Sequence, residues 1–341
     1  MLAFECDYNN GAHPIVLQHL LETNDTAQVG YGEDEYTSHA AQLIREFCGT
    51  PNANVSFLAG GTQTNVVVLS AILKPFEGVL CADSGHIHVH EAGAIENLGI
   101  KTLTLPSHHG KIDCKELSEW CRRFYADDNR EHMVFPGAVY ISHPTEYGTL
   151  YTKNELYAIA ETCRQFGMRL FLDGARLGYG LASLQTDVSI HDIAETCDVF
   201  CIGGTKVGAL CGEAVIFPNG TMPPHFANHV KKHGAMLAKG RLIGVQFEAL
   251  FTDNLYLEIS AHAIAMAERL KTILHEKGCR FFLETATNQQ FLIVSNEQLE
   301  AWKPHIRYSY WEPFDDAHTV VRLATSWSTK FEEIEALSAW L

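Results

Sequence analysis

The sequence predicts an α/β protein with a large domain built on a mostly parallel sheet, followed by a small α+β domain at the C-terminus. Between about residues 40 and 220, short apolar segments alternate with segments of helical periodicity, which is typical of parallel strands covered by helices on both faces. Beyond about residue 240 the rhythm changes to one long helical segment followed by strand-like runs. That change indicates a separate, smaller unit.

Seven short apolar runs are expected to form the large sheet. Runs of this kind suit strands that are buried on both faces. They cover residues 55–58, 79–82, 102–105, 138–142, 169–172, 199–202 and 214–217. Because ligands of such sheets bind at the carboxyl ends of the strands, we expect the functional residues there.

The segments between these runs are expected to be helices. Apolar residues recur at helical spacing over 36–47 and stop at Gly49, a helix C-terminal signal. Another helix is expected over 62–73, and the helix over 154–166 opens with a capping box formed by Thr152 and Glu155. In the C-terminal unit we expect a helix and three strands. The helix covers residues 259–276, and the strands cover residues 291–295, 307–311 and 320–325.

We expect three parts in the chain: an N-terminal arm (1–18), a large cofactor-binding domain (19–240) and a small C-terminal domain (241–341). The formal charge of −16 argues against nucleic acid and anionic membranes as partners, although a small charged metabolite fits. Without a signal peptide or an apolar span, the chain is expected to be cytoplasmic. Its ten scattered cysteines then read as free thiols.

A glycine-rich turn follows the first predicted strand. The glycines of Gly60-Gly61-Thr62 allow backbone N–H groups to approach an anion at the start of the next helix. A tight turn in which Thr62 is an ordinary N-cap is the alternative. The turn alone therefore does not decide for a phosphate site.

Two later strands each deliver one charged residue. Asp173 follows the apolar run 170–172, and a buried carboxylate is costly unless it meets a cation. Lys206 follows an apolar strand and two glycines, which would place its amine in a pocket where desolvation frees it as a nucleophile. The alternatives are an Asp that caps a turn and a solvated surface lysine.

Three histidines, His86, His88 and His90, alternate along the chain. On a strand they would share one face and form a metal site, as in a metal-dependent hydrolase. The segment continues as an apolar pattern to Leu98 that favours a helix, on which only His86 and His90 would share a face.

The order of these features is informative. A phosphate turn, an aromatic His, a strand-end Asp and a strand-end Lys are the parts that a pyridoxal 5′-phosphate (PLP) site needs: a phosphate cup, a ring that stacks on the pyridine, an acid for its nitrogen and a Schiff-base amine.

Several of these motifs resemble those of the threonine aldolase family, within the β-eliminating lyase group of fold-type-I PLP enzymes. The resemblance runs from Phe4 to about Thr325. Its strongest pieces are Tyr31-Gly32-Glu33-Asp34, Gly60-Gly61-Thr62, His86 with Glu91, Leu172-Asp173-Gly174-Ala175-Arg176, Lys206 and Val321-Arg322-Leu323. It implies a homodimer or homotetramer whose active sites are shared between subunits.

The resemblance also implies roles for individual residues. Gly60, Gly61 and Thr62 would hold the phosphate, His86 would stack on the ring and Asp173 would pair with its nitrogen. Arg176 would lie beside the cofactor, Lys206 would form the Schiff base and Arg322 would grip the substrate carboxylate. Tyr31 and Arg241 are similar to residues that reach the phosphate site of the neighbouring subunit.

Three positions depart from the family pattern. Cys6 precedes Asp7 where the family has Ser near the substrate carboxylate, Glu146 stands where it has a second His, and Thr205 replaces the Ser before the lysine. The resemblance implies cleavage of a β-hydroxy-α-amino acid to glycine and an aldehyde, with His86 ahead of Glu146 as the candidate base. Other PLP chemistry (β-elimination, transamination or racemisation) and a non-catalytic PLP-binding protein stay open beside the metal-dependent hydrolase.

Overall fold

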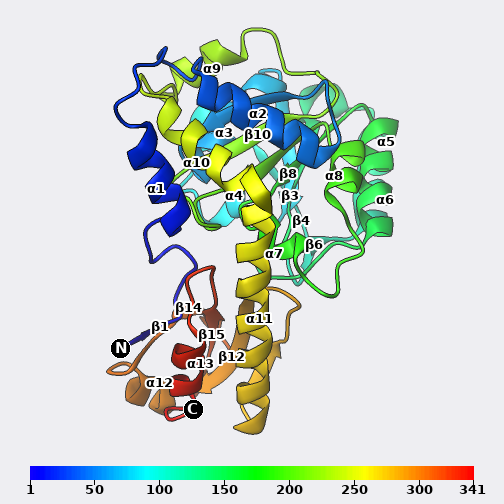
Figure 1. Cartoon of the computed structure of the whole chain (residues 1–341). Helices are drawn as coiled ribbons and strands as arrows, with labels where there is room; N and C mark the ends of the chain where they lie inside the picture. Colours follow the sequence, from blue (N-terminus) through cyan, green and yellow to red (C-terminus); the bar gives the residue numbers. More distant parts are fainter.

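A computed structural model describes the whole chain, residues 1–341. It contains a seven-stranded sheet with the order β2-β10-β9-β8-β7-β3-β4 and a separate four-stranded sheet (Figure 1). All seven predicted strands are present. They are β2 (Asn54–Leu58), β3 (Glu77–Ala82), β4 (Thr102–Leu105), β7 (Phe135–Ser142), β8 (Arg169–Asp173), β9 (Val199–Gly203) and β10 (Glu213–Phe217). Only β10 runs antiparallel to its neighbours, so the predicted mostly parallel sheet is confirmed.

Helices cover both faces of the large sheet because its strands are apolar on both sides. Along β7, Val139 and Ile141 pack into one core while Ala138 and Tyr140 pack into the other. The first core is closed by α2 (Glu35–Cys48), α5 (Cys114–Ala126), α6 (Lys153–Gln165), α8 (Ile190–Thr196) and α10 (Arg241–Phe251). The second is closed by α3 (Gly61–Ile72), α4 (His86–Val89) and α9 (Phe226–Lys232).

The predicted helix ends agree with the structure. α2 ends at Gly49, which has a left-handed backbone with φ 65°. At the start of α6, Thr152 accepts from the N–H of Glu155 and the Glu155 side chain accepts from Thr152, so the predicted capping box is present.

The C-terminal unit contains an antiparallel sheet with the order β11-β12-β15-β14. Its strands are β11 (Arg280–Leu283), β12 (Gln289–Ser295), β14 (Ser309–Pro313) and β15 (His318–Ala324). The predicted single strand over 307–311 is wrong, because Ile306 and Arg307 form β13 and pair in parallel with β1 (Leu2–Ala3). The start of the predicted strand therefore pairs with β1, and only the part from Ser309 onward pairs with β15 in the four-stranded sheet.

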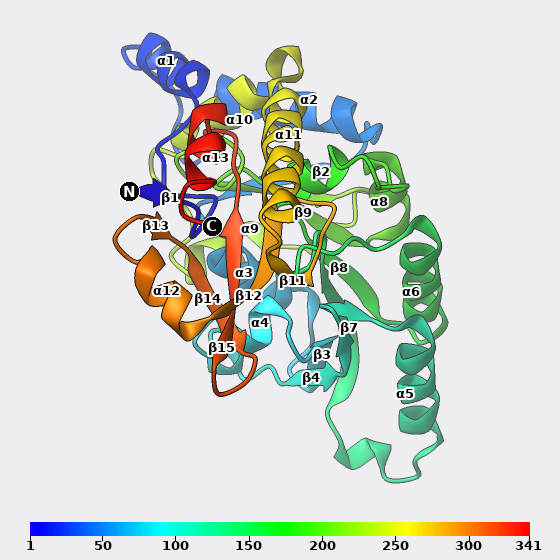
Figure 2. The ribbon, with the colours of Figure 1, turned by 90° about the horizontal axis from the view of Figure 1, so that it is seen from below.

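The long helix α11 (Leu255–Glu276) belongs to both units. Ile259 and Ala263 lie in the large core, whereas Leu270 and Leu274 lie in the small one. Figure 2 shows the same helix passing beside both sheets. Since α10 packs in the large core, α11 is the element that connects the units, and the domain boundaries at 18/19 and 240/241 stay predictions.

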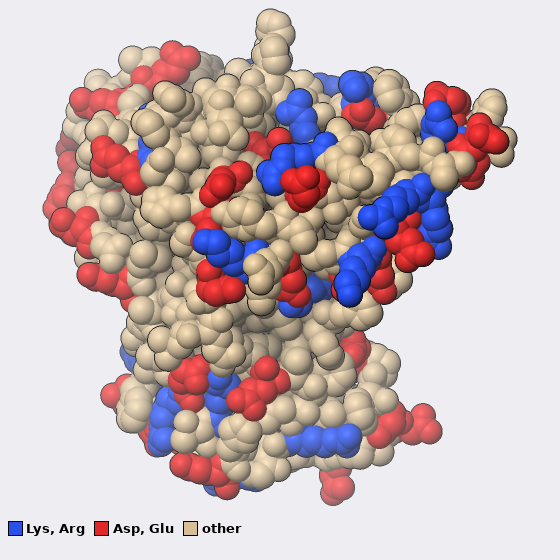
Figure 3. Space-filling view, turned by 90° about the vertical axis from the view of Figure 1, so that its right-hand side faces the viewer, with Lys and Arg blue, Asp and Glu red and all other residues tan.

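The surface carries mixed charge. In Figure 3, acidic and basic side chains lie intermingled on a face that narrows between the larger and the smaller unit. None of the helices combines the length and the apolar character that a membrane span requires.

Candidate active site

Most of the predicted catalytic and cofactor-binding residues converge on a recess at the carboxyl ends of β7, β8 and β9. Nine residues line its inner part, of about 40 Å³: Gly61, His86, Ser142, Pro144, Glu146, Asp173, Ala175, Arg176 and Lys206. His86, Glu146, Arg176 and Lys206 also line an outer hollow of about 540 Å³, which extends to Arg322 and Trp311 on the small sheet. The inner and outer parts together form one site between the two units.

Asp173 is the last residue of β8 and is buried. Its Oδ2 accepts from the hydroxyl of Tyr140 at 2.7 Å and from the amide of Asn65 at 3.2 Å, and its Oδ1 accepts from the N–H of Ala175 at 2.9 Å. These donors hold a carboxylate at the floor of the recess, and the interpretation of Asp173 as a mere turn cap is insufficient.

Lys206 follows β9 after the two predicted glycines. Gly203 lies so close to the loop after β8 that an added Cβ would come within 2.4 Å of the carbonyl oxygen of Ala175. This contact brings the Lys206 loop next to the Asp173 loop. Burial lowers the pKa of the Lys206 amine, and the charge of Arg176 lowers it further. Lys206 is therefore a buried amine suited to nucleophilic attack and not a surface charge.

The helix α3 begins at the recess without a side-chain cap. Gly60 occupies the N-cap position and no side chain bonds to the first turn, so its N–H groups are available to a ligand. Thr62 lies inside the helix, which makes the N-cap alternative wrong. Of the three predicted phosphate residues, Gly61 lines the recess, and the roles of Gly60 and Thr62 stay predictions.

The three histidines do not form a metal site. They occupy the short helix α4 and its C-cap, and His86 and His90 share a face with their rings 5.7 Å apart. His88 Nδ1 instead lies 3.2 Å from the hydroxyl of Thr102. The expected helix to Leu98 is also wrong, because Ala92 and Gly93 take positive φ and end it.

Glu146 lies beside His86 in the recess. Its Oε1 accepts from the backbone N–H of His86 at 2.9 Å and from the hydroxyl of Ser142 at 2.6 Å. Burial raises the pKa of the Glu146 carboxyl, and the hydrogen bond from Ser142, which lowers this pKa, offsets only part of the effect. The glutamate at this position therefore remains part of the site.

The N-terminal segment contributes Asp7 more than Cys6. Asp7 accepts two hydrogen bonds from Arg176, and the Cys6 thiol lies against the side chain of Asn9. Cys6 does not line the recess or the outer hollow, whereas Tyr8 does line the latter. The position that the family resemblance implies for Cys6 stays a prediction.

Arg322 lies at the rim of the outer hollow on β15. Its Nη1 donates to Gln289 Oε1 at 2.9 Å, and its Nη2 donates to the Glu5 carbonyl at 3.0 Å. The buried Nε has no partner within the chain and remains a donor for a ligand. Burial and the charge of Arg176 lower the pKa of the Arg322 guanidinium to about 10, so it remains cationic at neutral pH.

Tyr31 and Arg241 lie outside this recess. Tyr31 is exposed and lines a separate, mostly apolar hollow of about 270 Å³, with Lys231 Nζ 5.1 Å from the centre of its ring. Arg241 donates to the carbonyls of Thr23 and Thr26. Their participation in a neighbouring subunit's site stays a prediction.

The structure adds site residues that the sequence did not single out. They are Asn65, Tyr140, Ser142, Tyr8 and Trp311. His90, considered from the sequence only as a metal ligand, also lines the outer hollow. Figure 2 shows α4 beside the strands of the small sheet. The rings of His90 and Trp311 are 6.3 Å apart there. Of these residues, only Asn65 could have been noticed in the sequence, because it is a polar residue in the otherwise apolar middle of α3.

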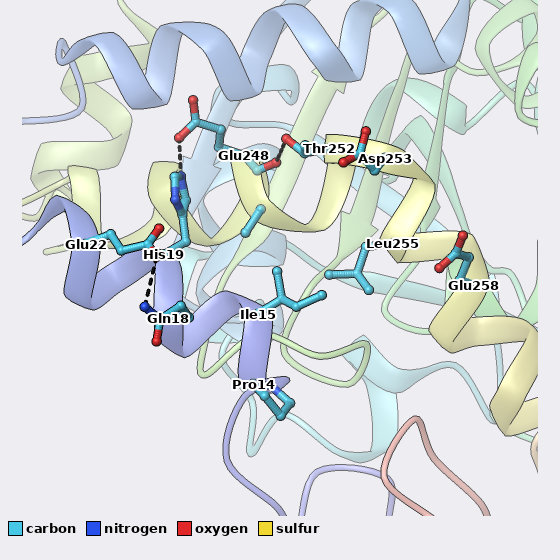
Figure 4. A pocket seen from close by; sticks show the side chains of 11 residues that line it. Pro14, Ile15, Gln18, His19, Glu22, Glu248, Thr252, Asp253, Leu255 and Glu258 are labelled. Atoms are coloured by element: carbon cyan, nitrogen blue, oxygen red, sulfur yellow. Dashed lines mark hydrogen bonds and ion pairs between the residues drawn. The ribbon is translucent and has the colours of Figure 1, made fainter.

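A second, larger hollow of about 670 Å³ lies between α1 (Pro14–Thr23) and α10 (Figure 4). Four of its polar residues pair with one another: His19 Nε2 lies 2.6 Å from Glu248 Oε2, and Gln18 donates to Glu22 at 2.8 Å. It holds none of the predicted catalytic residues. This hollow is therefore not the predicted site.

Comparison with known proteins agrees with this geometry. The low-specificity L-threonine aldolase of Pseudomonas sp. is 29% identical over 340 residues, which cover 98% of this chain and 96% of that protein. The structure of Leishmania major threonine aldolase superposes with a TM-score of 0.95 at 40% identity, covering 99% of this chain and 98% of that one.

More distant structures share the fold alone. Aspartate aminotransferase of Thermus thermophilus superposes with a TM-score of 0.72 at 16% identity, covering 100% of this chain and 92% of that one. This likeness confirms the predicted fold-type-I architecture. The family model described as "Beta-eliminating lyase" matches residues 18–297. The chain therefore belongs to the β-eliminating lyase family.

Proposed function

We propose that the chain is a PLP-dependent aldehyde-lyase that cleaves the Cα–Cβ bond of β-hydroxy-α-amino acids such as threonine, giving glycine and an aldehyde. One observation carries the proposal: the buried amine of Lys206 and the carboxylate of Asp173 line the same recess, into which α3 directs its uncapped N-terminus. The names of the Pseudomonas and Leishmania relatives support the choice of substrate.

The residues of the recess fit PLP. Lys206 would hold its aldehyde covalently, Asp173 would pair with the ring nitrogen, and the first turn of α3 would bind the phosphate. His86 would lie against the ring face and Arg176 beside it. When bound, PLP supplies an electron sink for the α-carbon of an amino acid.

The remaining residues would bind and orient the substrate. The guanidinium of Arg322 lines the outer hollow and its buried Nε has no partner within the chain, which suits it to a carboxylate. His86 is the candidate for taking the proton of the β-hydroxyl, since Glu146 Oε1 already accepts from two donors. A charged Asp173 would keep the proton on the ring nitrogen and so stabilise charge that develops in the transition state.

The proposal includes a homodimer or homotetramer in which Tyr31 and Arg241 complete the phosphate site of a neighbouring subunit. Their distance from the recess of their own chain supports this assignment. The ten cysteines are all unpaired, which supports the expected reducing compartment.

An absorbance spectrum of the purified protein, recorded before and after addition of threonine, allo-threonine and phenylserine, tests the proposal when combined with product identification. Bound PLP with glycine and an aldehyde as products is the expected result. A keto acid would favour β-elimination or transamination. PLP without turnover of any amino acid would favour a non-catalytic protein, and a protein that binds no PLP would overturn the proposal.

A further inference from the structure

Glu91 contacts His86 but lines neither the inner recess nor the outer hollow. Its side chain has no exposed surface. Glu91 Oε1 lies 2.8 Å from His86 Nδ1 and 2.7 Å from the amide nitrogen of Asn65, while Oε2 has no partner. One carboxylate oxygen thus meets two nitrogen atoms inside the protein.

The amide of Asn65 fixes the direction of these hydrogen bonds. Its Nδ2 lies within reach of Glu91 Oε1 and, at 3.2 Å, of Asp173 Oδ2. The reverse orientation would place the amide oxygen against two carboxylates, so each N–H must point to one of them. Asn65 therefore acts as a double donor between two buried acids.

The proton between Glu91 and His86 follows from their basicity. An imidazole holds a proton more tightly than a carboxylate, so the proton lies on Nδ1 and Glu91 accepts it. When His86 is neutral, its Nε2 then carries a lone pair. This atom makes no hydrogen bond within the chain, and His86 lines both parts of the site.

We infer that Glu91 is a positioning residue: it fixes the orientation and the tautomer of His86 so that Nε2 presents a proton acceptor to the bound substrate, and Asn65 joins this pair to Asp173. The line from the buried residues Asp173, Asn65 and Glu91 to His86 thereby couples the group at the ring nitrogen to the group at the ring face. The inference deepens the proposed function, and depends on it only for the consequence in turnover.

The test compares Glu91→Leu, which removes the acceptor, with Glu91→Gln, which keeps an acceptor of similar shape. Glu96→Gln is the matched control, because Glu96 lies on the same segment and contacts Thr102 instead. Histidine labelled with ¹⁵N reports the tautomer by NMR in the protein without PLP, and His86→Asn identifies the His86 signals.

In the wild-type protein and in the Glu91→Gln and Glu96→Gln variants, we expect neutral His86 to carry its proton on Nδ1 and none on Nε2. In Glu91→Leu we expect the proton on Nε2 and, after PLP is added, a kcat for threonine cleavage lower by about 10²-fold or more. Glu91→Gln should keep most of the wild-type kcat.

Wild-type protein with the proton on Nε2 would overturn the inference, as would Glu91→Leu with unchanged His86 signals. If Glu91→Leu does not fold, the wild-type spectrum still decides. Absence of glycine formation by the wild type would overturn the proposed function instead, while the NMR result for the apoprotein would stand.

Discussion

Arg176 donates two parallel hydrogen bonds to Asp7, from Nε to Oδ2 at 2.7 Å and from Nη2 to Oδ1 at 2.9 Å. The two residues are 169 positions apart in the chain. Asp7 Oδ2 also accepts from the amide of Asn288 at 3.0 Å. The N-terminal segment is thus bound both to the loop after β8 and to the residue that precedes β12 in the small sheet.

Asp7→Ala should destabilise the protein by about 3–5 kcal/mol, because Arg176 would keep a buried charge without a partner. Burial alone would raise the pKa of Asp7, but the charge and hydrogen bonds of Arg176 lower it to about 2. The wild-type advantage should therefore be full above about pH 4 and fade as the pH falls towards 2. Urea denaturation of wild type and Asp7→Ala over this pH range measures the difference in the free energy of unfolding, and the exposed Asp315→Ala is the control. Equal unfolding free energies for wild type and Asp7→Ala would contradict the buried ion pair.

Lys206→Ala should abolish turnover and covalent PLP, since no other amine lines the recess. Borohydride reduction followed by peptide mass analysis is the measurement: wild-type protein should carry reduced PLP on the Lys206 peptide. Lys206→Arg keeps the charge and should be equally inactive. Label on a different lysine would remove the proposed role.

Asp173→Asn keeps the size of the side chain and removes its charge. We expect kcat for threonine cleavage to fall by about 10²-fold or more, with a smaller loss of PLP affinity, because the charge matters most in the transition state. Steady-state kinetics with saturating PLP, together with a PLP titration, separates the two effects. An unchanged kcat would exclude this role for Asp173.

Glu213→Gln tests a buried acid on β10 near Lys206. Burial raises the pKa of Glu213 to about 8, against the opposing effect of Lys206. In the unfolded chain its pKa is about 4.3, so the folded state binds an extra proton between these values and the wild type loses stability as the pH rises through them.

The neutral amide introduced by Glu213→Gln lacks this dependence. The free energy of unfolding should therefore be similar for wild type and Glu213→Gln at pH 5, whereas at pH 9 the variant should be the more stable protein. The exposed Glu119→Gln is the control. A difference that does not change with pH would contradict the raised pKa.

Trp311→Ala should weaken substrate binding, because the Arg322 guanidinium carbon lies 5.5 Å from the centre of the Trp311 ring. Losing this cation–π contact should raise KM for threonine by about 5- to 30-fold, with a smaller change in kcat. Phe314→Ala removes a similar contact with Arg280, at 4.7 Å, and should leave KM unchanged. Equal KM values in both variants would refute the prediction.

The sequence predicted those parts of the fold and site that depend on local pattern. Asp173 and Lys206 each follow an apolar run at a strand end, so parallel-sheet geometry alone brings them to one edge. The seven strands of the large sheet were predictable for the same reason.

Contacts between distant segments were not predictable in this way. Whether Asp7 meets Asn288, 281 positions away, depends on how the small unit docks. The split of the run 307–311 likewise depends on the pairing of β1 with β13. Asn65 occupies a helix position whose meaning appears only once Glu91 and Asp173 lie beside it.

The bond between Asp7 and Arg176 and the position of Arg322 also constrain the order in which the site can assemble during translation. Asp7 is synthesised before Arg176, and Arg322 follows both of them in the chain. The large sheet can begin to fold earlier, but Asp7 must wait for both Arg176 and Asn288. A nascent chain arrested before about residue 325 would therefore carry the Lys206 amine without the cation that is proposed to hold its substrate.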